Sequence, residues 1–314
     1  MTRELRGAPV ARELTARVAE RAARLAAAGV TPCLTMVRVG ERGDDLAYER
    51  AAEKRCHSAG VAVRHVTLPA DCAQAELESA LAEASADASV HGILLFRPLP
   101  DPLDAAAAAR RIDPAKDVDG VTDACQLRVL SGRADGFAPC TAEAVLALLD
   151  HYEVSLDGAD VTVIGRSDVI GRPVAALLLA RNATVTTCHT HTRDLAACCR
   201  CADVVVAAAG APGTVGASCV AAGQVVVDVG TTWDEAAGRL VGDVDASAAE
   251  GVVGALTPVP GGVGSVTTAV LVDHVVRAAE AQVARAAEPQ TRRPAPFRPA
   301  QPHPAPATER TPDV

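Results

Sequence analysis

Two glycines enclose a polar turn near the middle of the chain. The run from Val161 to Val174 reads VTVIGRSDVIGRPV, so a β-branched apolar segment leads through the turn into an Ala/Leu-rich segment. This pattern predicts a buried strand that feeds a helix N-terminus, where backbone N–H groups and the positive end of the helix dipole can bind a phosphate. The full Gly-x-Gly-x-x-Gly spacing is absent, and close packing of strand on helix would also explain Gly165 and Gly171.

Two further clusters contain residue types that bind metals. His189 and His191 have the i, i+2 spacing that puts two imidazoles on one face at the end of a strand. Cysteines also gather in the run CCRC at 198–201. Zinc sites usually combine two spaced pairs of ligands, and neither cluster has a second pair or a third ligand at a suitable spacing. We therefore expect no metal site, and we interpret the cysteines as structural thiols in a reducing compartment.

Strands and helices alternate along the chain, and these elements would have to position the residues above. The first series consists of helices over 13–28, 45–58 and 77–88 and strands over 34–39, 61–68 and 91–96. The second series consists of a helix over 141–150, strands over 161–164, 184–188, 204–207 and 225–229, and a last helix over 266–286. This alternation predicts an α/β fold of two domains with a cleft between them. The second domain should be Rossmann-like, with ligands at the C-terminal ends of its strands.

Composition narrows the class of protein further. A chain of 314 residues with 49% hydrophobic content can bury two cores, and its formal charge of −9 disfavours nucleic acid as a partner. Aromatic residues make up 2%, too few for base-stacking surfaces. No apolar run has transmembrane length and no signal peptide is visible, so we expect a soluble cytoplasmic protein that does not bind membranes. The Pro- and Arg-rich segment 287–314 is expected to be a disordered tail.

Several ordered motifs together make the chain recognisable. They are KDVDG at 116–120, GRS at 165–167 with GRP at 171–173, DVG at 228–230, GDV at 242–244 and TPVPGGVG at 257–264. With these motifs the chain resembles the bifunctional methylenetetrahydrofolate dehydrogenase/methenyltetrahydrofolate cyclohydrolase family of the bacterial FolD type, over about residues 1–285. The resemblance implies an enzyme of one-carbon metabolism that acts on tetrahydrofolate derivatives with NADP as cofactor and forms a homodimer through the nucleotide domain.

The same resemblance implies where the domains begin and end. Residues 1–140 would form a folate-binding catalytic domain that the last helix, 266–286, completes. Residues 141–265 would form the Rossmann-like NADP-binding domain, followed by the tail at 287–314.

Six residues receive cofactor-binding roles from the resemblance: Gly165, Arg166, Ser167, Gly171, Thr190 and Thr231. The two glycines would let the backbone approach the pyrophosphate. Arg166 and Ser167 would hold the 2′-phosphate, and Thr190 stands at a family serine position that shares this task. Thr231 stands where the family usually has Ile-Asn, so only a backbone contact is expected there.

The resemblance also implies a folate site with Asp119 and Tyr48 as its catalytic and substrate-binding residues. The Asp119 carboxylate would accept hydrogen bonds from adjacent N–H groups of the pterin ring, although a solvated turn aspartate is the simpler interpretation. Tyr48 would pack near the folate. The loop of Val259, Pro260, Gly261 and Gly262 would form a wall over folate and nicotinamide.

Two positions depart from the family pattern. The family's general acid/base lysine, four residues after the tyrosine, is Ala52 here, and the glutamine that orients that lysine is Phe96. Lys54 is close in sequence but should lie on another face of the helix. We therefore expect the dehydrogenase activity to persist and the cyclohydrolase activity to be weak or lost. A non-catalytic folate- or NADP-binding paralogue, and a divergent dehydrogenase that acts on a modified pterin stacked on Phe96, remain as alternatives.

Overall fold

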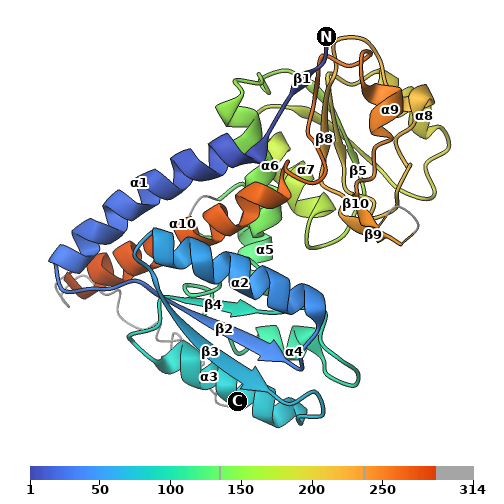
Figure 1. The fold of residues 1–314 in the computed structure, drawn as a ribbon. Helices are drawn as coiled ribbons and strands as arrows, with labels where there is room; N and C mark the ends of the chain where they lie inside the picture. The colour runs from blue at the N-terminus through green and yellow to red at the C-terminus, as the bar shows by residue number, and fades with distance from the viewer. Residues whose placement is uncertain (134–135, 236–237, 288–314) are drawn as a thin grey trace, which may run out of the picture.

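The computed structural model describes residues 1–133, 136–235 and 238–287, in two α/β units (Figure 1). One unit contains a three-stranded sheet of order β3-β2-β4, and the other a six-stranded sheet of order β1-β11-β8-β7-β5-β6. Every strand pair in both sheets is parallel. The predicted two-domain α/β architecture is therefore confirmed. All but the first residue of the predicted disordered tail lies outside the described residues.

The N-terminal unit places helices on both faces of its sheet. Its strands are β2 (Cys33–Val39), β3 (Ala62–Leu68) and β4 (Gly92–Leu95), and its helices are α1 (Gly7–Ala27), α2 (Gly43–Ser58), α3 (Gln74–Ala86) and α4 (Ala105–Ala109). Every residue of β2 is buried. Its side chains alternate, so that Leu34 and Met36 pack into the core cluster shared with α2 and α10, and Val37 and Val39 pack with α3. A central strand covered on both faces explains why even its polar residues, Thr35 and Arg38, are buried.

The six-stranded sheet contains the predicted Rossmann-like strands and two more. Its strands are β5 (Asp160–Ile164), β6 (Thr184–Cys188), β7 (Val204–Ala207), β8 (Val225–Asp228), β11 (Ala255–Leu256) and β1 (Arg3–Glu4). Its helical segments are α7 (Gly171–Leu179), α8 (Leu195–Arg200), α9 (Ala246–Ala249) and the 3₁₀ turn η1 (Ala217–Cys219). A small hairpin, β9 (Thr232–Asp234) with β10 (Arg239–Val241), stands apart from the sheet. The chain order reverses between β5 and β7, and ligands of such folds bind at this switch point.

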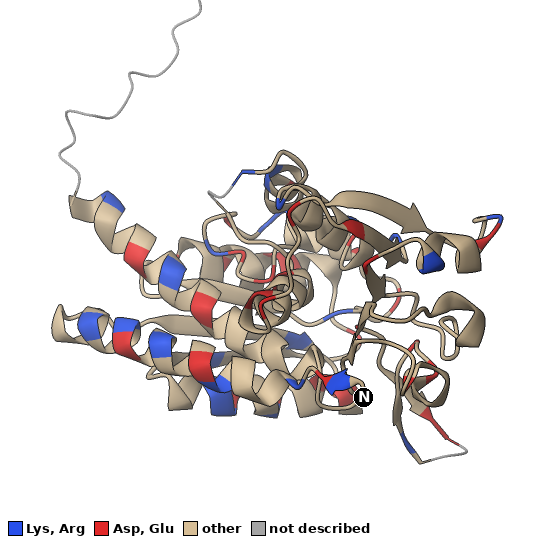
Figure 2. Cartoon of the chain, turned by 90° about the horizontal axis from the view of Figure 1, so that it is seen from above, with Lys and Arg blue, Asp and Glu red and all other residues tan. Residues whose placement is uncertain are grey.

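Three helices complete the molecule: α5 (Asp123–Leu130), α6 (Cys140–His151) and α10 (Gly264–Ala287). The last of these returns to the N-terminal unit and lies along α1, α6 and α2 (Figure 1). Acidic and basic side chains alternate along α1 and α10 (Figure 2). Arg21 of α1 binds Asp273 at 2.5 Å and Glu280 at 2.6 Å on α10, which ties the two long helices together. Among the described residues, no helix combines the length and the apolar character that a bilayer span requires.

Several predicted limits differ from the structure by two to six residues. The helix expected over 13–28 begins at Gly7, and the helix expected over 77–88 runs over 74–86. The first turn of α1 includes Gly7 and Pro9 and that of α3 includes Gln74 and Glu76, so each helix begins before its apolar repeat is established. The short helices α4 and α5 were not predicted, because each is too short to show a helical period, although Asp104 and Thr122 cap them with side-chain hydrogen bonds.

Candidate active site

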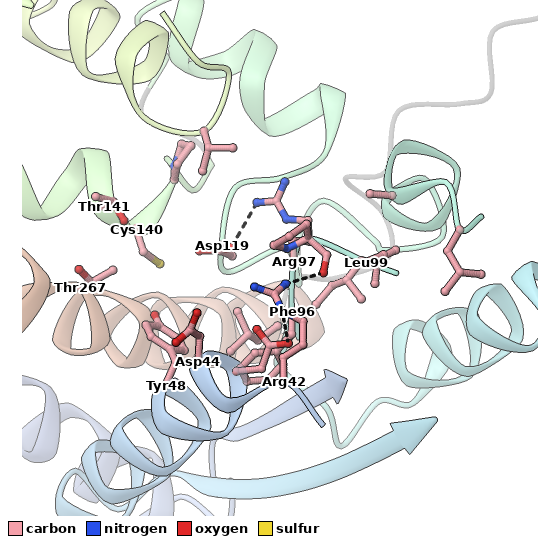
Figure 3. A pocket seen from close by; sticks show the side chains of 18 residues that line it. Arg42, Asp44, Tyr48, Phe96, Arg97, Leu99, Asp119, Cys140, Thr141 and Thr267 are labelled. Atoms are coloured by element: carbon pink, nitrogen blue, oxygen red, sulfur yellow. Dashed lines mark hydrogen bonds and ion pairs between the residues drawn. The ribbon is translucent and has the colours of Figure 1, made fainter. Parts of the chain in front are cut away.

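A cleft of about 730 Å³ opens between the two domains (Figure 3). Residues at the C-terminal edge of the three-stranded sheet line it, together with Val169 from the turn after β5. Phe96 and Arg97 follow β4 directly, and Asp119 lies two residues after Asp117, which forms a parallel bridge with Ile93 of β4. Because parallel strands end at the same edge of a sheet, these side chains converge in one place.

Asp119 is the acidic centre of the cleft, with 23% of its side chain exposed. Its Oδ2 lies 3.7 Å from Nη2 of Arg97. Burial raises the pKa of Asp119 to about 6, although the Arg97 cation opposes this shift. Its neighbour Asp117 is fully buried and accepts the backbone N–H groups of Val121 at 3.0 Å and Thr122 at 2.7 Å. Asp117 therefore fixes the turn, and Asp119 presents a partly buried carboxylate to the cleft, which does not fit a solvated turn aspartate.

An aromatic pair also lines the cleft. The rings of Tyr48 on α2 and Phe96 lie 6.2 Å apart between centroids at 80°, an edge-to-face contact. Phe96 is buried and Tyr48 is half-buried. Burial, with the nearby Cys140 and Asp119, raises the pKa of the Tyr48 phenol well above its usual range, so the hydroxyl stays protonated. The cleft therefore offers an apolar surface for a flat ring, with the Asp119 carboxylate close to it.

The predicted cofactor residues lie at the C-terminal edge of the six-stranded sheet. Gly165 follows β5, Thr190 comes two residues after β6, and Thr231 comes three residues after β8. Gly165 has a φ of +116°, and a Cβ atom there would lie 2.0 Å from the carbonyl oxygen of Ala208, which follows β7. A Cβ on Gly171 would lie 2.3 Å from the carbonyl oxygen of Gly165. Both glycines thus let the protein's own loops pack tightly at the switch point.

The turn between those glycines is braced by Ser167. Its Oγ accepts the backbone N–H groups of Ile170 at 3.2 Å and Gly171 at 3.3 Å, next to the start of α7. The side chains of Arg166, Ser167, Thr190 and Thr231 are all exposed. They are accessible to a ligand on this edge, and their individual roles stay predictions.

Comparison with known proteins agrees with this geometry. The model of the tetrahydrofolate dehydrogenase/cyclohydrolase catalytic domain matches residues 5–119, and the model of the NAD(P)-binding domain of the same family matches residues 139–283. The chain belongs to this family. The predicted family, enzyme class and NADP cofactor are thereby confirmed at the level of the family.

Individual relatives align over nearly their whole length. The Bifunctional protein FolD 1 of Rhodococcus jostii (strain RHA1) is 48% identical over 284 residues, which is 90% of this chain and 95% of the relative. The crystal structure of FolD methylenetetrahydrofolate dehydrogenase/cyclohydrolase from Campylobacter jejuni superposes with a TM-score of 0.87 at 35% identity, covering 90% and 99% of the two chains. The FolD structure from Trypanosoma brucei, complexed with NADP cofactor and inhibitor, has a TM-score of 0.85 at 34% identity over 90% and 98%.

Ala52 stands at the position where the family has its acid/base lysine. Ala52 is completely buried in the core cluster beneath α2 and does not line the cleft. Lys54 is exposed on another face of α2, as predicted. Among the described lining residues, the cations are Arg42 and Arg97. A guanidinium donates hydrogen bonds but cannot accept a proton, so neither arginine replaces a lysine as acid/base.

The Pro/Gly loop after β11 is not among the described residues that line the cleft. Val259 and Pro260 are joined by a cis peptide bond, and Val259 lines a separate cavity of about 850 Å³ with Thr257. The carbonyl oxygen of Gly261 accepts the N–H of Gly7 at 2.8 Å, and Gly262 packs against the same residue at the start of α1. The expected wall over the folate therefore stays a prediction.

The histidines and cysteines that the sequence analysis considered as metal ligands do not form a common site in the described part of the chain. The rings of His189 and His191 lie 6.0 Å apart, and Cys198 and Cys199 lie on α8. In the described part of the chain, no three potential metal ligands gather. Cys56 is fully buried, and burial raises the pKa of its thiol to about 12, which leaves it unsuited as a nucleophile.

Sequence reasoning missed two residues, one that lines the cleft and one that lies behind it. Cys140, at the start of α6, lines the cleft, and its thiol donates to the carbonyl oxygen of Val118 at 3.2 Å. His274 of α10 lies behind it, fully buried. The Asp119 motif was recognisable, but no pattern linked these residues to it, because they come from helices distant in sequence.

Proposed function

We propose that this chain oxidises 5,10-methylenetetrahydrofolate to 5,10-methenyltetrahydrofolate with NADP⁺, and that it hydrolyses the methenyl product weakly or not at all. The observation that carries the proposal is the composition of the cleft: Asp119 is present and accessible, whereas the position of the family lysine is the buried Ala52. The carboxylate expected to bind the substrate is present, and the lysine expected to transfer protons is absent.

The dehydrogenase step needs no acid/base group from the protein. A hydride passes from the methylene carbon to the nicotinamide, and the lone pair of a substrate nitrogen supplies the electrons for the new C=N bond. This step depends mostly on the positions of the two rings. Asp119 would hold the pterin through its ring N–H and amino groups, with Tyr48 beside it. The nucleotide would bind at the edge near Gly165, where the exposed Arg166, Ser167 and Thr190 are suited to the 2′-phosphate of NADP.

The hydrolytic step needs a group that moves protons. Water must be activated at the methenyl carbon, and a positioned acid/base contributes about 10²–10⁴-fold to such a step. Phe96 is apolar, and Arg97 and Arg42 do not exchange protons. Asp119 has a suitable pKa of about 6, but its binding role holds it at the pterin edge.

A second candidate is a dehydrogenase for a modified pterin. The observation that favours it is Phe96, whose buried ring forms part of the cleft wall beside Tyr48. An additional aromatic surface there would suit a substrate with a different ring substituent. The modified pterin would then be oxidised faster than methylenetetrahydrofolate.

Parallel assays of both activities on the purified protein test the proposal. We expect NADP⁺ reduction that requires methylenetetrahydrofolate, slower turnover with NAD⁺, and methenyl hydrolysis near the uncatalysed rate. Position 52 lies one helical turn after Tyr48, which lines the cleft, so a lysine there can extend its amine toward the cleft. The double variant Ala52→Lys with Phe96→Gln should therefore gain hydrolysis by about 10²-fold. The single variant Phe96→Gln is the matched control and should gain nothing. Full hydrolytic activity in the wild-type protein would sink the proposal, and binding without hydride transfer would favour a non-catalytic paralogue.

We also propose that the protein is a homodimer that works in the cytoplasm. The hairpin β9–β10 of the nucleotide domain supports the dimer, since Trp233 and Leu240 pair across it and are 60% and 38% exposed. Apolar side chains exposed together often mark an interface. Light scattering should give twice the chain mass, and Trp233→Ser should shift the protein toward the monomer. A wild-type monomer at assay concentration would contradict this.

A further inference from the structure

A buried histidine that the proposed mechanism does not use lies directly behind Asp119. His274 of α10 has no exposed side-chain surface. Its Nδ1 is 2.8 Å from the carbonyl oxygen of Val118, and its Nε2 is 2.9 Å from Oε2 of Glu143 on α6. A carbonyl oxygen can only accept, so Nδ1 must carry a proton. The carboxylate on the other side favours a second proton at Nε2.

The surrounding charges favour this doubly protonated form. Burial by itself would lower the pKa of His274, but the Glu143 carboxylate outweighs it and raises that pKa. Although burial opposes ionisation of Glu143, the cations of His274 and Arg277 lower its pKa to about 2. Arg277 Nη1 binds Glu143 at 3.2 Å and lies 3.8 Å from Asp273, and its guanidinium stacks on the ring of Phe137. His274 is thus one cation in a chain of alternating charges between α6 and α10.

This row of alternating charges ends at the peptide bond that precedes Asp119. The carbonyl oxygen of Val118 belongs to the Val118–Asp119 peptide, and two donors hold it from behind: Nδ1 of His274 at 2.8 Å and Sγ of Cys140 at 3.2 Å. The Cys140 thiol also lies 3.8 Å from Nδ1 of His274. Burial, reinforced by the Asp119 charge, raises the pKa of Cys140 well above its ordinary value, so it stays a thiol donor.

We propose that His274 is a positioning residue for Asp119: it anchors the Val118–Asp119 peptide and keeps a buried positive charge behind the carboxylate. The proposal rests on the pterin-binding role proposed above for Asp119. Two separable effects follow from one side chain. The hydrogen bond to Val118 sets where the carboxylate points, and the charge sets the pH range in which it is ionised.

The charges that face each group make the direction of the second effect clear. Around Asp119 lie Arg97 in the cleft, His274 behind, Asp117 beside it and Cys140. Both cations favour the ionised carboxyl group. Around His274 lie Glu143 and Cys140 from α6 and Arg277 from its own helix. Glu143 and the Val118 carbonyl oxygen favour the cation, and Arg277 opposes it. Removing the charge of His274 should therefore raise the pH below which Asp119 loses its negative charge.

Three variants separate the anchor from the charge. His274→Asn keeps an amide donor near the Val118 carbonyl and removes the charge. His274→Leu removes both. Glu143→Gln leaves the imidazole and its anchor but removes the carboxylate that keeps it protonated. The probe is tetrahydrofolate, titrated calorimetrically into the full-length protein from acidic to mildly alkaline pH, and kcat and KM for methylenetetrahydrofolate are measured over the same range.

In the wild-type protein we expect affinity to fall below about pH 6, following Asp119. His274→Asn and Glu143→Gln should bind within about twofold of wild type at alkaline pH, with the acid limb moved to higher pH. His274→Leu should show the same movement and in addition bind about five- to tenfold more weakly at every pH, because a buried hydrogen bond is lost. The effect should appear in KM more than in kcat.

Unmoved acid limbs in both His274→Asn and Glu143→Gln would overturn the inference, whatever the stability of His274→Leu. Those two variants also serve if the leucine variant does not fold. Failure of the proposed function has a different signature. Wild-type protein that binds tetrahydrofolate without reducing NADP⁺ would overturn the dehydrogenase proposal and leave the pH comparison valid, whereas wild-type protein that binds no tetrahydrofolate would overturn both.

Discussion

The strand-end loops of the two domains treat their buried carboxylates in opposite ways. In the nucleotide domain, Asp228 accepts the N–H groups of Gly230, Asp243 and Val244 at 2.9–3.0 Å. Asp243 accepts three more, from residues 209–211, at 2.6–3.0 Å. Asp119, in the cleft, has the Arg97 ion pair at 3.7 Å and the neighbouring Cys140 thiol. The carboxylates of Asp228 and Asp243 accept hydrogen bonds from the backbone of their own domain. The carboxylate of Asp119 can still accept hydrogen bonds from a ligand.

Similar pKa values thus have different meanings in the two regions. Burial raises the pKa of Asp228 to about 6 although three backbone N–H groups oppose the shift. Burial raises the pKa of Asp119 to about 6 although the cations of Arg97 and His274 and the Cys140 thiol oppose the shift. A perturbed pKa marks both residues, but only unused hydrogen-bonding capacity separates a binding group from a structural one. The predictions below test this difference, from the largest expected effect to the smallest.

Asp119→Asn should cause the largest loss. Two hydrogen bonds to a charged acceptor are worth about 1.5–3 kcal/mol each, so kcat/KM for methylenetetrahydrofolate should fall by about 10²–10⁴-fold. Asp44→Asn, on the α2 side of the same cleft, is the matched control and should stay within about threefold of wild type. Equal losses in the two variants would mean that general negative charge in the cleft, and not the Asp119 position, binds the substrate.

The same variant should not be less stable at neutral pH. Asp119 has a folded-state pKa of about 6, above its ordinary value of 3.8. Its contribution to stability is therefore fully present below the ordinary value and is lost as the pH rises through 6. Replacement by a neutral amide should leave the melting temperature at pH 7.5 unchanged or higher. A large drop would show that Asp119 is structural, like Asp228.

Gly165→Ala should produce the opposite result, a loss of stability in the nucleotide domain. The added Cβ would lie 2.0 Å from the Ala208 carbonyl oxygen at a positive φ, so β5 and β7 would have to separate. Overpacking and strain of this kind cost about 2–4 kcal/mol in the free energy of unfolding. Gly213→Ala, also at a positive φ but in open space, should cost about 1 kcal/mol. Urea denaturation that gives the two variants equal stability would contradict the packing role.

The nucleotide domain is also the part whose elements are most predictable from sequence. The predicted limits of β6 and β7 agree with the structure because each strand is a β-branched or apolar run with clear ends. By contrast, β1 at Arg3–Glu4 pairs with β11 from the far end of the chain, and two polar residues carry no strand pattern. Such an element exists only because a partner strand is already in place.

The candidate site also has a part that the sequence predicts and a part that depends on tertiary packing. The motif around Asp119 points to a carboxylate in a turn, but the ion pair with Arg97 requires the ends of two separate segments to meet. His274 is a polar residue in an apolar helical pattern, where a surface position would be the ordinary expectation. It is buried because Glu143 and the Val118 carbonyl satisfy both ring nitrogens. Local patterns do not encode partners that only tertiary packing supplies.

Arg97→Leu should have a moderate, pH-dependent effect on the folate side. Arg97 lowers the pKa of Asp119, so its loss should move the acid limb of tetrahydrofolate affinity to higher pH. Near pH 6.5 the affinity should fall by about three- to tenfold, and at pH 8.5 it should approach wild type. Arg42→Leu is the control, because Arg42 binds the carbonyl oxygen of Pro98 instead and should leave the acid limb in place. A loss that is equal at both pH values would indicate direct contact of Arg97 with the substrate.

Ser167→Ala should give the smallest effect and should be confined to the cofactor. The Ser167 hydroxyl accepts two backbone N–H groups at the turn before α7, and loss of such a cap costs about 1 kcal/mol. The KM for NADP⁺ should rise by about fivefold, while the KM for methylenetetrahydrofolate stays unchanged. Ser247→Ala, which removes a hydroxyl that donates to Asp245 at the start of α9 in the same domain, should change neither KM. If Ser167→Ala raised the KM for methylenetetrahydrofolate as much as the KM for NADP⁺, the C-terminal edges of the two sheets would not act independently. The contrast between a nucleotide loop held by its own hydrogen bonds and a folate-site carboxylate open to a ligand would then be wrong.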